Sequence, residues 1–436
     1  MKPLRIGLLG IGTVGGGTFD VLARNAEEIS RRAGRPITIT HVADKNTTLA
    51  NQVVAGRAVV TDDAFALVKN PDIDVIIELI GGYTIAKQLM LDAINNGKHV
   101  VTANKALLAL HGNEIFGAAR AKGVIVAFEA AVAGGIPIIK ALREGLVANR
   151  IEWIAGIING TTNFILSEMR SKGLAFADVL KEAQAKGYAE ADPTFDIEGV
   201  DAGHKASILA SLAFGIPLSF DKAHVEGITK IEAKDIRYAE EMGYRIKLLG
   251  IARRRAAGIE LRVHPTLIPT KRLIANVEGV MNAVLVKGDA VGATLYYGAG
   301  AGAQPTASAV IADLVDIARL IDADASHRVP YLAFQHDRIG TEPVLPMDEV
   351  ETSYYLRLRV DDKPGVLADI TRVLADNSIS IDAMLQKEPE EGESQADIIL
   401  LTHETIEKNV KRAIAAIEAQ ASTSGKIVLL RLENLA

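Results

Sequence analysis

The chain contains no cysteine, and this absence removes three kinds of chemistry at once. Disulfide bridges, thiolate nucleophiles and cysteine-ligated zinc are excluded. The sequence also has no apolar run of about 18 residues and no signal-peptide pattern at its start, so we expect neither a membrane partner nor export. The expected location is the cytoplasm.

Positive charge is not in excess either. Lysine plus arginine total 48 against 54 for aspartate plus glutamate, a formal net charge of -6. A chain with this charge lacks the basic surface typical of nucleic-acid-binding proteins, so we expect no nucleic-acid partner. The 436 residues indicate two or three domains, and small molecules are the expected partners.

A glycine-rich turn follows the first apolar run. Residues 4–9 predict a buried strand, the sequence Gly-Ile-Gly-Thr-Val-Gly follows, and a helical pattern continues to about residue 32. Gly10 allows a tight turn, Gly12 lets a pyrophosphate approach the backbone, and Gly15 permits close helix packing. The pattern predicts a dinucleotide site at Gly10, Ile11, Gly12, Thr13, Val14 and Gly15.

The second predicted strand, residues 37–43, ends at Asp44, where a carboxylate can meet the ribose of an adenine dinucleotide. Lys45 follows directly. The carboxylate favours NAD, whereas the lysine could hold the 2′-phosphate of NADP. These two residues leave NADP and NAD both open as the cofactor.

Two more strands end in residues suited to a ligand. Residues 74–80 end in Gly81 and Gly82, and residues 99–103 precede Lys105, with a helical pattern between them. Ligands of an open parallel sheet collect at the carboxyl ends of its strands, so Gly81, Gly82 and Lys105 fall on the cofactor side. A solvated loop charge is an equal alternative for Lys105.

Another apolar strand, residues 124–128, runs into Glu129 and a turn of small residues that ends at Pro137. The carbonyl groups of such a turn, with the carboxylate beside them, are the oxygen ligands that hard cations prefer. A helix cap at Pro137 explains the same residues equally well.

After residue 140 the pattern becomes that of a mainly antiparallel sheet. Residues 151–158 predict a strand that ends in Asn159-Gly-Thr-Thr-Asn163, and this turn also caps the next helix. Further strands are expected near residues 224–231, 244–252, 260–267 and 281–287. The glycine run 298–302 precedes a helix at 306–321, and suits close approach to a ligand or a hinge.

The stretch 187–205 is dense in acids and ends in a lysine. Five acids precede Lys205, namely Glu190, Asp192, Asp196, Glu198 and Asp201. If a helix begins near Gly199, Asp201 and Lys205 lie one turn apart on the same face. Alone, the pattern fits an acidic loop and an ordinary surface ion pair. Beside a dinucleotide-binding module it predicts a proton donor and its partner.

A third region follows an aperiodic linker. The elements expected in it are strand, helix, strand, strand, helix and strand, over residues 354–360, 364–376, 379–387, 395–402, 404–419 and 427–432. This β-α-β-β-α-β order is that of a ferredoxin-like domain. The charged run 388–393 is expected to be a solvated hairpin tip.

Together these residues resemble homoserine dehydrogenase over essentially the whole chain. The resemblance rests on the glycine turn, Thr102-Ala-Asn-Lys105 and, at the expected distance, Gly187, Asp192-Pro193, Asp196-Ile197, Gly199, Asp201 and Lys205. The last region resembles an ACT domain, with Asp362-Lys-Pro-Gly-Val-Leu367 as its ligand-type first turn.

The fold class expected from this resemblance is α/β, with a Rossmann-type parallel sheet, an α+β catalytic and oligomerisation domain, and a ferredoxin-like ACT domain. Residues 1–135 would bind the dinucleotide, with 304–335 returning to that domain. Residues 136–303 would form the catalytic and oligomerisation domain, 336–351 the linker, and 352–436 the ACT regulatory domain.

The resemblance implies NAD(P)-dependent interconversion of L-homoserine and L-aspartate 4-semialdehyde, in threonine, methionine and isoleucine biosynthesis. Lys205 would donate a proton to the carbonyl oxygen in reduction and act as the base in oxidation, while Asp201 would hold and charge-balance it. Lys105 would lie beside the nicotinamide with a role in proton relay, and Gly302 would join the cofactor site.

Substrate contacts are implied in the same way. Glu190 would bind the substrate ammonium group, and Gly160 and Thr161 would also contact substrate. The remaining acids of the stretch, Asp192, Asp196 and Glu198, are expected to be loop structure.

The resemblance also implies a structural sodium ion held by Glu129 and the carbonyl groups of Val132, Gly134 and Ile136. Its ACT part implies an amino-acid effector, threonine, and feedback regulation. A homodimer or homotetramer is expected.

Two alternatives stay open. A non-catalytic sensor could bind a nucleotide and an amino acid and act through partners, although the joint presence of Glu190, Asp201, Lys105 and Lys205 argues against it. An enzyme of the same class could act on another amino-acid semialdehyde.

Overall fold

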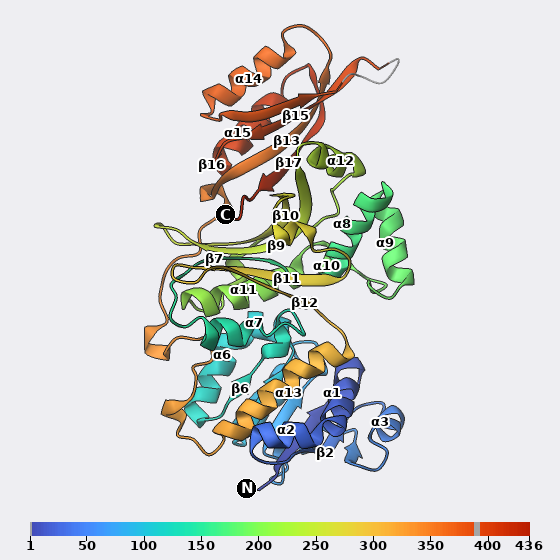
Figure 1. Ribbon diagram of the computed structural model, residues 1–436, viewed down its shortest axis with the longest axis vertical. Helices are drawn as coiled ribbons and strands as arrows, with labels where there is room; N and C mark the ends of the chain where they lie inside the picture. The colour runs from blue at the N-terminus through green and yellow to red at the C-terminus, as the bar shows by residue number, and fades with distance from the viewer. Residues whose placement is uncertain (1, 388–392) are drawn as a thin grey trace.

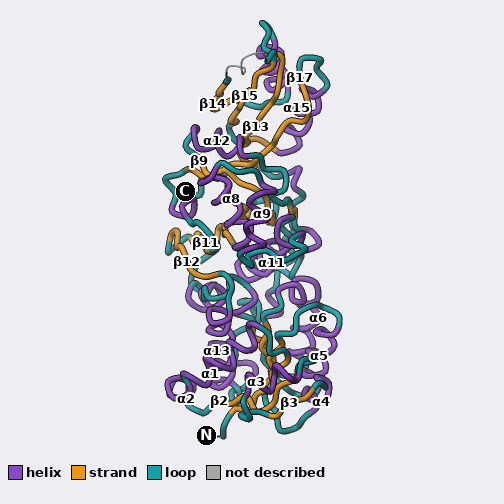
Figure 2. The backbone as a smooth tube through the Cα atoms, turned by 90° about the vertical axis from the view of Figure 1, so that its right-hand side faces the viewer, coloured by secondary structure: helices purple, strands orange, loops and turns teal. Residues whose placement is uncertain are grey.

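A computed structural model describes residues 2–387 and 393–436 of the chain. The molecule is elongated, with a parallel sheet and its helices at one end, the C-terminal elements at the other, and a second sheet between them (Figure 1). The same order along the long axis is seen from the side in Figure 2. Most of the charged run expected as a hairpin tip, residues 388–392, lies outside the described residues.

The first sheet has six parallel strands in the order β3-β2-β1-β4-β5-β6. Its strands are β1 (Leu4–Leu9), β2 (Ile37–Ala43), β3 (Val59–Thr61), β4 (Val75–Glu78), β5 (His99–Thr102) and β6 (Val126–Ala127). The helices between them are α1 (Thr13–Arg24), α2 (Ala26–Ala33), α3 (Thr47–Val54), α4 (Ala64–Lys69), α5 (Ile85–Asn95) and α6 (Lys105–Lys122). The strand order reverses between β1 and β4, and doubly wound sheets bind ligands at such a point. The Rossmann-type sheet is therefore confirmed.

One helix of this region differs from the expected one. The single helix predicted to continue to about residue 32 is wrong, because α1 ends at Arg24 and α2 begins at Ala26. Between them Asn25 leaves the helical conformation, with φ -106 and ψ 19. The break turns α2 so that its apolar residues Ile29 and Ala33 join the same buried cluster as β1.

Helix α13 (Ala303–Leu320) brings a distant part of the chain back to the first sheet. It lies beside α1 in Figure 1, and its buried residues Ala307, Val310 and Leu314 belong to the cluster that contains β1. A Cβ atom on Gly17 of α1 would lie 2.6 Å from the carbonyl oxygen of Ala303, so the two backbones are in direct contact.

The second sheet is mixed and has eleven strands, nine of them in the order β12-β11-β7-β9-β10-β17-β13-β15-β14, with β8 on β10 and β16 on β13. The strands before residue 300 are β7 (Ile151–Ile157), β8 (His224–Val225), β9 (Tyr244–Arg254), β10 (Ile259–Pro269), β11 (Met281–Gly288) and β12 (Gly292–Ala299). The helices of this part are α7 (Ile138–Lys140), α8 (Gly160–Lys172), α9 (Phe176–Ala185), α10 (Thr194–Ile197), α11 (Val200–Phe214) and α12 (Ala233–Glu241).

The strands of this part differ from the predicted ones in two places. The strand expected near residues 224–231 is only the two-residue β8, because Gly227 packs so closely on α10 that a Cβ there would lie 2.1 Å from the carbonyl oxygen of Ile197. The last strand, β12, was not predicted, and it forms an antiparallel hairpin with β11.

The C-terminal elements follow the predicted β-α-β-β-α-β order. They are β13 (Glu351–Asp361), α14 (Val366–Asp376), β14 (Ile381–Gln386), β15 (Gln395–Thr402), α15 (Glu407–Glu418) and β17 (Thr423–Leu432), with the short β16 (Thr405–Ile406) before α15. Their sheet is not separate, because β17 pairs with β10 in parallel through Thr266 with Arg431 and Leu267 with Leu432. One continuous sheet therefore joins the middle and C-terminal regions.

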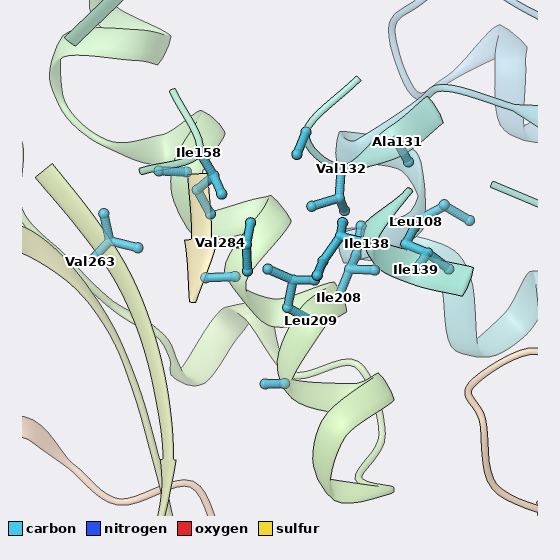
Figure 3. Packing of buried hydrophobic residues seen from close by; sticks show 14 of the residues in the cluster. Leu108, Ala131, Val132, Ile138, Ile139, Ile158, Ile208, Leu209, Val263 and Val284 are labelled. Carbon is cyan, nitrogen blue, oxygen red and sulfur yellow. The ribbon is translucent and has the colours of Figure 1, made fainter. Parts of the chain in front are cut away.

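Helix α11 lies at the centre of the molecule and positions the site. Figure 3 shows Ile208 and Leu209 of this helix between Ile138 of α7 on one side and Val284 of β11 on the other. All four side chains are buried. In the described part of the chain, no helix has the length and apolar character needed to cross a membrane.

Candidate active site

Helix α11 carries Asp201 and Lys205 on one face, as predicted from their spacing. The helix starts after Gly199, whose φ of 82 is in the left-handed region that glycine adopts without strain. Lys205 Nζ lies 2.7 Å from Asp201 Oδ2. The pair is not an ordinary surface ion pair, because the side chains of Lys205 and Asp201 are only 12% and 4% exposed.

A second lysine reaches the same carboxylate from the first sheet. Lys105 begins α6 directly after β5, and its Nζ lies 3.3 Å from Asp201 Oδ1. Its side chain is 36% exposed, so it is the more open of the two lysines. Asp201 therefore joins an ammonium group from each of two regions.

The end of β7 completes the surroundings of Lys205. The carbonyl oxygen of Ile158 accepts a hydrogen bond from Lys205 Nζ at 2.8 Å. Next to it, Asn159 donates from Nδ2 to Asp201 Oδ2 at 2.9 Å. Two of the three ammonium hydrogens of Lys205 thus have protein acceptors, and the third is available to a substrate oxygen.

Asp196 was expected to be loop structure, and this expectation is wrong. Its Oδ1 accepts a hydrogen bond from Asn159 Nδ2 at 2.7 Å, and its Oδ2 accepts from Thr161 Oγ1 at 3.3 Å. The short helix α10 turns the carboxylate inward, whereas Asp192 and Glu198 stay exposed. The sequence places Asp196 five residues before Asp201. Helix periodicity could not predict that the two side chains meet, because Asp196 lies in α10 and Asp201 in the separate helix α11.

Burial and charge act in opposite directions on these acids. Burial would raise the pKa of Asp201, but the ammonium groups of Lys205 and Lys105 and the Asn159 amide hold it down at about 2. The pKa of Asp196 is raised instead, first by burial and then by the charge of Asp201. Asp201 is therefore an anion over the whole physiological range, and both lysines contact it in this form.

The glycine turn has the geometry of a dinucleotide loop. Gly10 has a φ of 91, and a Cβ on Gly15 would lie 2.0 Å from the carbonyl oxygen of Gly10. A Cβ on Gly12 would meet no atom within 4 Å, so this side of the loop is open to a ligand at the start of α1. Thr13 and Val14 form the first turn of that helix.

The carboxylate of Asp44 binds the same loop. Its Oδ2 accepts from the backbone N–H of Ile11 at 2.8 Å, and its Oδ1 accepts from that of Asn46 at 2.8 Å. Lys45 beside it is exposed. The structure thus places both residues at the end of β2, next to the glycine turn.

The other predicted cofactor residues lie at strand ends or helix starts. Gly81 and Gly82 follow β4 with φ values of 72 and 69, and the carbonyl oxygen of Gly82 accepts from Asn104 Nδ2 at 2.6 Å. Gly302 precedes α13 with a φ of 126. The contact between α1 and the start of α13 brings Gly302 to the helix that follows the glycine turn.

Glu129 lies away from these groups and caps a helix. Its two carboxylate oxygens accept from the backbone N–H groups of Ile139 and Lys140, each at 2.9 Å, at the start of α7. Burial, and then the charge of Asp313, raise the pKa of Glu129 to about 7. Among the described residues no cluster of three or more His, Asp or Glu side chains suits a metal ion.

Glu190 is not brought into the catalytic group. Its side chain is exposed and makes no hydrogen bond or ion pair within the described residues, although its carbonyl oxygen accepts from Gln184. Gly160 packs against the residue that precedes β11, since a Cβ on Gly160 would lie 2.7 Å from the carbonyl oxygen of Val280. Thr161 Oγ1 lies 2.7 Å from the carbonyl oxygen of Tyr188 as well as 3.3 Å from Asp196, and so joins the turn after β7 to the acidic stretch.

Family models match three parts of the chain. The sequence model "Homoserine dehydrogenase, NAD binding domain" matches residues 10–129, and "Homoserine dehydrogenase" matches residues 137–315. The ACT domain model matches residues 354–422.

Individual relatives match end to end. A protein of Pseudomonas aeruginosa described as homoserine dehydrogenase is 62% identical over 435 residues, covering 100% of both chains. The crystal structure of a homoserine dehydrogenase from Thiobacillus denitrificans is 67% identical with a TM-score of 0.96, and the match covers 100% of this chain and 99% of that one. A hyperthermophilic archaeal homoserine dehydrogenase in complex with NADPH is 25% identical with a TM-score of 0.63, and the match covers 74% of this chain and 100% of that one.

Proposed function

Because the chain belongs to the homoserine dehydrogenase family and is an NAD(P)-dependent oxidoreductase of amino-acid biosynthesis, we propose how its own residues divide the work of converting L-aspartate 4-semialdehyde and L-homoserine into each other. The bound nicotinamide supplies or accepts the hydride. The protein orients the two reactants and moves one proton. A non-catalytic sensor would not need the lysine pair that meets at Asp201.

Lys205 is the proton donor to the carbonyl oxygen in reduction and the base in oxidation. It fits this role because two of its hydrogens are held by Asp201 and Ile158, which aims the third at one position. Asp201 keeps both lysines in place as a permanent anion. Lys105, which is more exposed, lies on the cofactor side and relays the proton.

The substrate binds between the acidic stretch and the turn after β7. Gly160 and Thr161 contact it, and Glu190, whose exposed side chain makes no hydrogen bond or ion pair among the described residues, binds its ammonium group. Asp196 adds a second anion beside Thr161. The two carboxylates give an amino-acid substrate preference over a plain aldehyde, because the ammonium group gains charge-assisted hydrogen bonds.

The cofactor is NADP or NAD, bound at Gly10 to Gly15, Asp44, Lys45, Gly81, Gly82, Lys105 and Gly302. The open side of Gly12 and the start of α1 fit a pyrophosphate. The NADPH in the archaeal relative supports the phosphorylated form for this chain. Lys45 is the residue that would meet the 2′-phosphate, so Lys45→Ala should raise the KM for NADP more than that for NAD.

The observation that carries the proposal is the meeting of Lys205 and Lys105 on one buried carboxylate. The test is a set of initial rates, measured at 340 nm with each of the two cofactors. The substrates are homoserine, aspartate 4-semialdehyde, and other amino-acid alcohols and semialdehydes, each with and without threonine. Turnover restricted to homoserine and aspartate semialdehyde supports it. A faster rate with another amino-acid semialdehyde would overturn the substrate assignment.

A sodium ion at Glu129, Val132, Gly134 and Ile136 is part of the proposal. The carbonyl oxygens of Val132 and Gly134 accept no hydrogen bond from any described residue, although both residues are buried. Buried carbonyl groups without a hydrogen-bond donor fit a hard cation, to which Glu129 would add a carboxylate oxygen. Thermal unfolding in sodium and in choline chloride tests it, since a bound ion raises Tm and Glu129→Gln should remove the difference.

The ACT domain indicates an amino-acid effector, and we propose threonine, bound at the turn Asp362 to Leu367. Deleting the whole domain is a poor test because β17 is a strand of the second sheet. Asp362→Ala in the full chain, measured for threonine inhibition with homoserine turnover as control, tests the site without removing a strand.

We also propose that the chain forms a homo-oligomer in the cytoplasm. The edge strand β12 presents Tyr297, 58% exposed, and neighbouring apolar residues to solvent, which favours a homodimer or homotetramer. Light scattering on the purified protein determines which. We place the enzyme in the cytoplasm, which supplies the dinucleotide pool, and fractionation of cells tests this.

A further inference from the structure

Asn159 lies between the two inward-facing carboxylates and uses one amide hydrogen on each. Its Nδ2 is 2.7 Å from Asp196 Oδ1 and 2.9 Å from Asp201 Oδ2. The residue is buried, with 4% exposure. It therefore connects the acid that holds Lys205 with the acid beside Thr161, and these acids belong to different helices.

The orientation of this amide is determined by its other end. Asn159 Oδ1 accepts from the backbone N–H of Thr162 at 2.8 Å and from Thr162 Oγ1 at 2.9 Å. A backbone N–H only donates, so the atom facing it is the oxygen and the NH₂ group faces the carboxylates. With two donors and two accepted bonds, the side chain has no hydrogen left for a substrate.

We infer that Asn159 is a positioning residue that sets the distance between Asp196 and Asp201 and thereby couples substrate binding to the proton donor. Asp201 is buried and Asp196 is half-buried. The two carboxylates repel each other, and each amide hydrogen offsets part of this repulsion. When a substrate ammonium group draws on Asp196, the shared amide transmits the movement to Asp201 and hence to Lys205. The inference rests on the proposed roles of Lys205 and Asp201.

The experiment separates the bridge from the helix cap that the same side chain provides. Asn159→Ser keeps a residue that caps helices well but has no second donor to reach both acids. Asn159→Asp keeps the shape and the cap, and replaces the donor with a negative oxygen. Asn159→Ala loses both functions. Asp63→Ala is the matched control for a lost cap, because Asp63 caps α4 through Ala66 N at 2.9 Å and is exposed.

We expect Asn159→Ser to lower kcat/KM for homoserine roughly 10- to 100-fold through both kcat and KM, which is the range for losing charge-assisted hydrogen bonds. Its Tm should stay closer to that of the wild type than the Tm of Asn159→Ala does. Cofactor KM should not change. Asn159→Asp should move the rising limb of the kcat/KM profile for homoserine oxidation to higher pH, because the added anion favours the ammonium form over the amine that acts as base.

The inference is wrong if Asn159→Ser keeps the wild-type kcat, KM and pH profile while Asn159→Ala loses only as much Tm as Asp63→Ala, since Asn159 would then be a cap and nothing more. Full turnover in Lys205→Ala would instead overturn the proposed role of Lys205. The two failures are thus seen in different variants.

Discussion

Two ion clusters of this molecule are each built around a buried carboxylate and differ in the cation. The catalytic cluster consists of Lys205, Asp201, Lys105, Asn159 and Asp196. The junction network consists of Arg262, Glu260, Glu433, Arg431 and Glu407, where the middle and C-terminal parts of the second sheet meet. The catalytic cluster uses lysine, and some of its ammonium hydrogens have no protein acceptor. The junction network uses arginine, and almost all of its guanidinium hydrogens have one.

The buried arginines of the junction network use most of their donors on carboxylates, and Arg253, Arg255 and Glu226 extend the network toward the surface. Arg262 pairs with Glu260 at 2.9 Å and with Glu433 at 2.5 Å, and the side chains of all three are at most 3% exposed. Arg431 pairs with Glu407 at 2.5 Å, and also donates to Glu226 at 2.7 Å. These forks join β10 to β17 and α15, so charge here ties the C-terminal domain to the middle of the chain.

The difference follows from the chemistry of the two cations. An arginine stays protonated and presents five donors in a rigid plane, which suits a permanent structural link. A lysine has three donors on a flexible stem and can lose a proton, which suits acid and base catalysis. Four predictions test the comparison, from the largest expected effect to the smallest.

Lys205→Ala should lower kcat by about 10² to 10⁴ while leaving the Kd of the cofactor nearly unchanged, because it removes the proton donor and not the dinucleotide loop. Steady-state rates in both directions and cofactor fluorescence titration measure this. Lys205→Arg is the sharper variant, since it keeps the charge near Asp201 but cannot act as a base. Substantial oxidation of homoserine by Lys205→Arg would break the distinction between the clusters.

Arg262→Met should lower the free energy of unfolding by about 3 kcal/mol, at the lower end of the range for breaking a buried ion pair. Glu260 and Glu433 would lose the buried partner that they share, but would keep Arg255 and Arg253, which are more exposed. Denaturant unfolding, monitored by the single tryptophan, gives the value. The activity that remains at low temperature should be close to normal. A stable Arg262→Met with lost turnover would show that the junction network serves the reaction directly.

Acid should destabilise the protein partly through Asp201. Its pKa is about 2 in the fold against a reference of 3.8, so the carboxylate contributes stability above pH 4 that is lost as the pH falls toward 2. The contribution is about 2 kcal/mol. Urea unfolding between pH 5 and 2 should therefore have a shallower pH slope in Lys205→Met than in the wild type. Equal slopes would show that Lys205 does not hold this carboxylate as an anion.

Lys426→Ala should have the smallest effect on stability, and it is the reference against which the other three variants are compared. Lys426 is 89% exposed and lies 2.6 Å from Glu418. A surface pair of this kind contributes about 0–1 kcal/mol, because water screens it and the long side chain loses rotamer freedom. Thermal unfolding at low and high salt checks this. A loss as large as that in Arg262→Met would mean that burial does not explain the comparison.

Prediction from the sequence succeeded where a pattern repeats locally. The Gly10 to Gly15 turn with its flanking strand, the C-terminal β-α-β-β-α-β order and the start of α11 were all predicted, because backbone geometry and side-chain periodicity determine them. It failed where a neighbour in space decides. The break at Asn25 accompanies the packing of Ile29 and Ala33 in the buried cluster that α13 also joins, and the loss of the strand after Val225 accompanies the contact of Gly227 with α10.

The same division holds for the site. The sequence by itself determined that Asp201 and Lys205 share a face, because four residues make about one helical turn. It also determined that a dinucleotide loop precedes them. Only the tertiary structure decided that Lys105 reaches the same carboxylate, that Asp196 turns inward and that Asn159 joins the acids. These contacts arise because α11 is packed between α6 and the second sheet, so buried charges from distant parts of the chain must find their partners there.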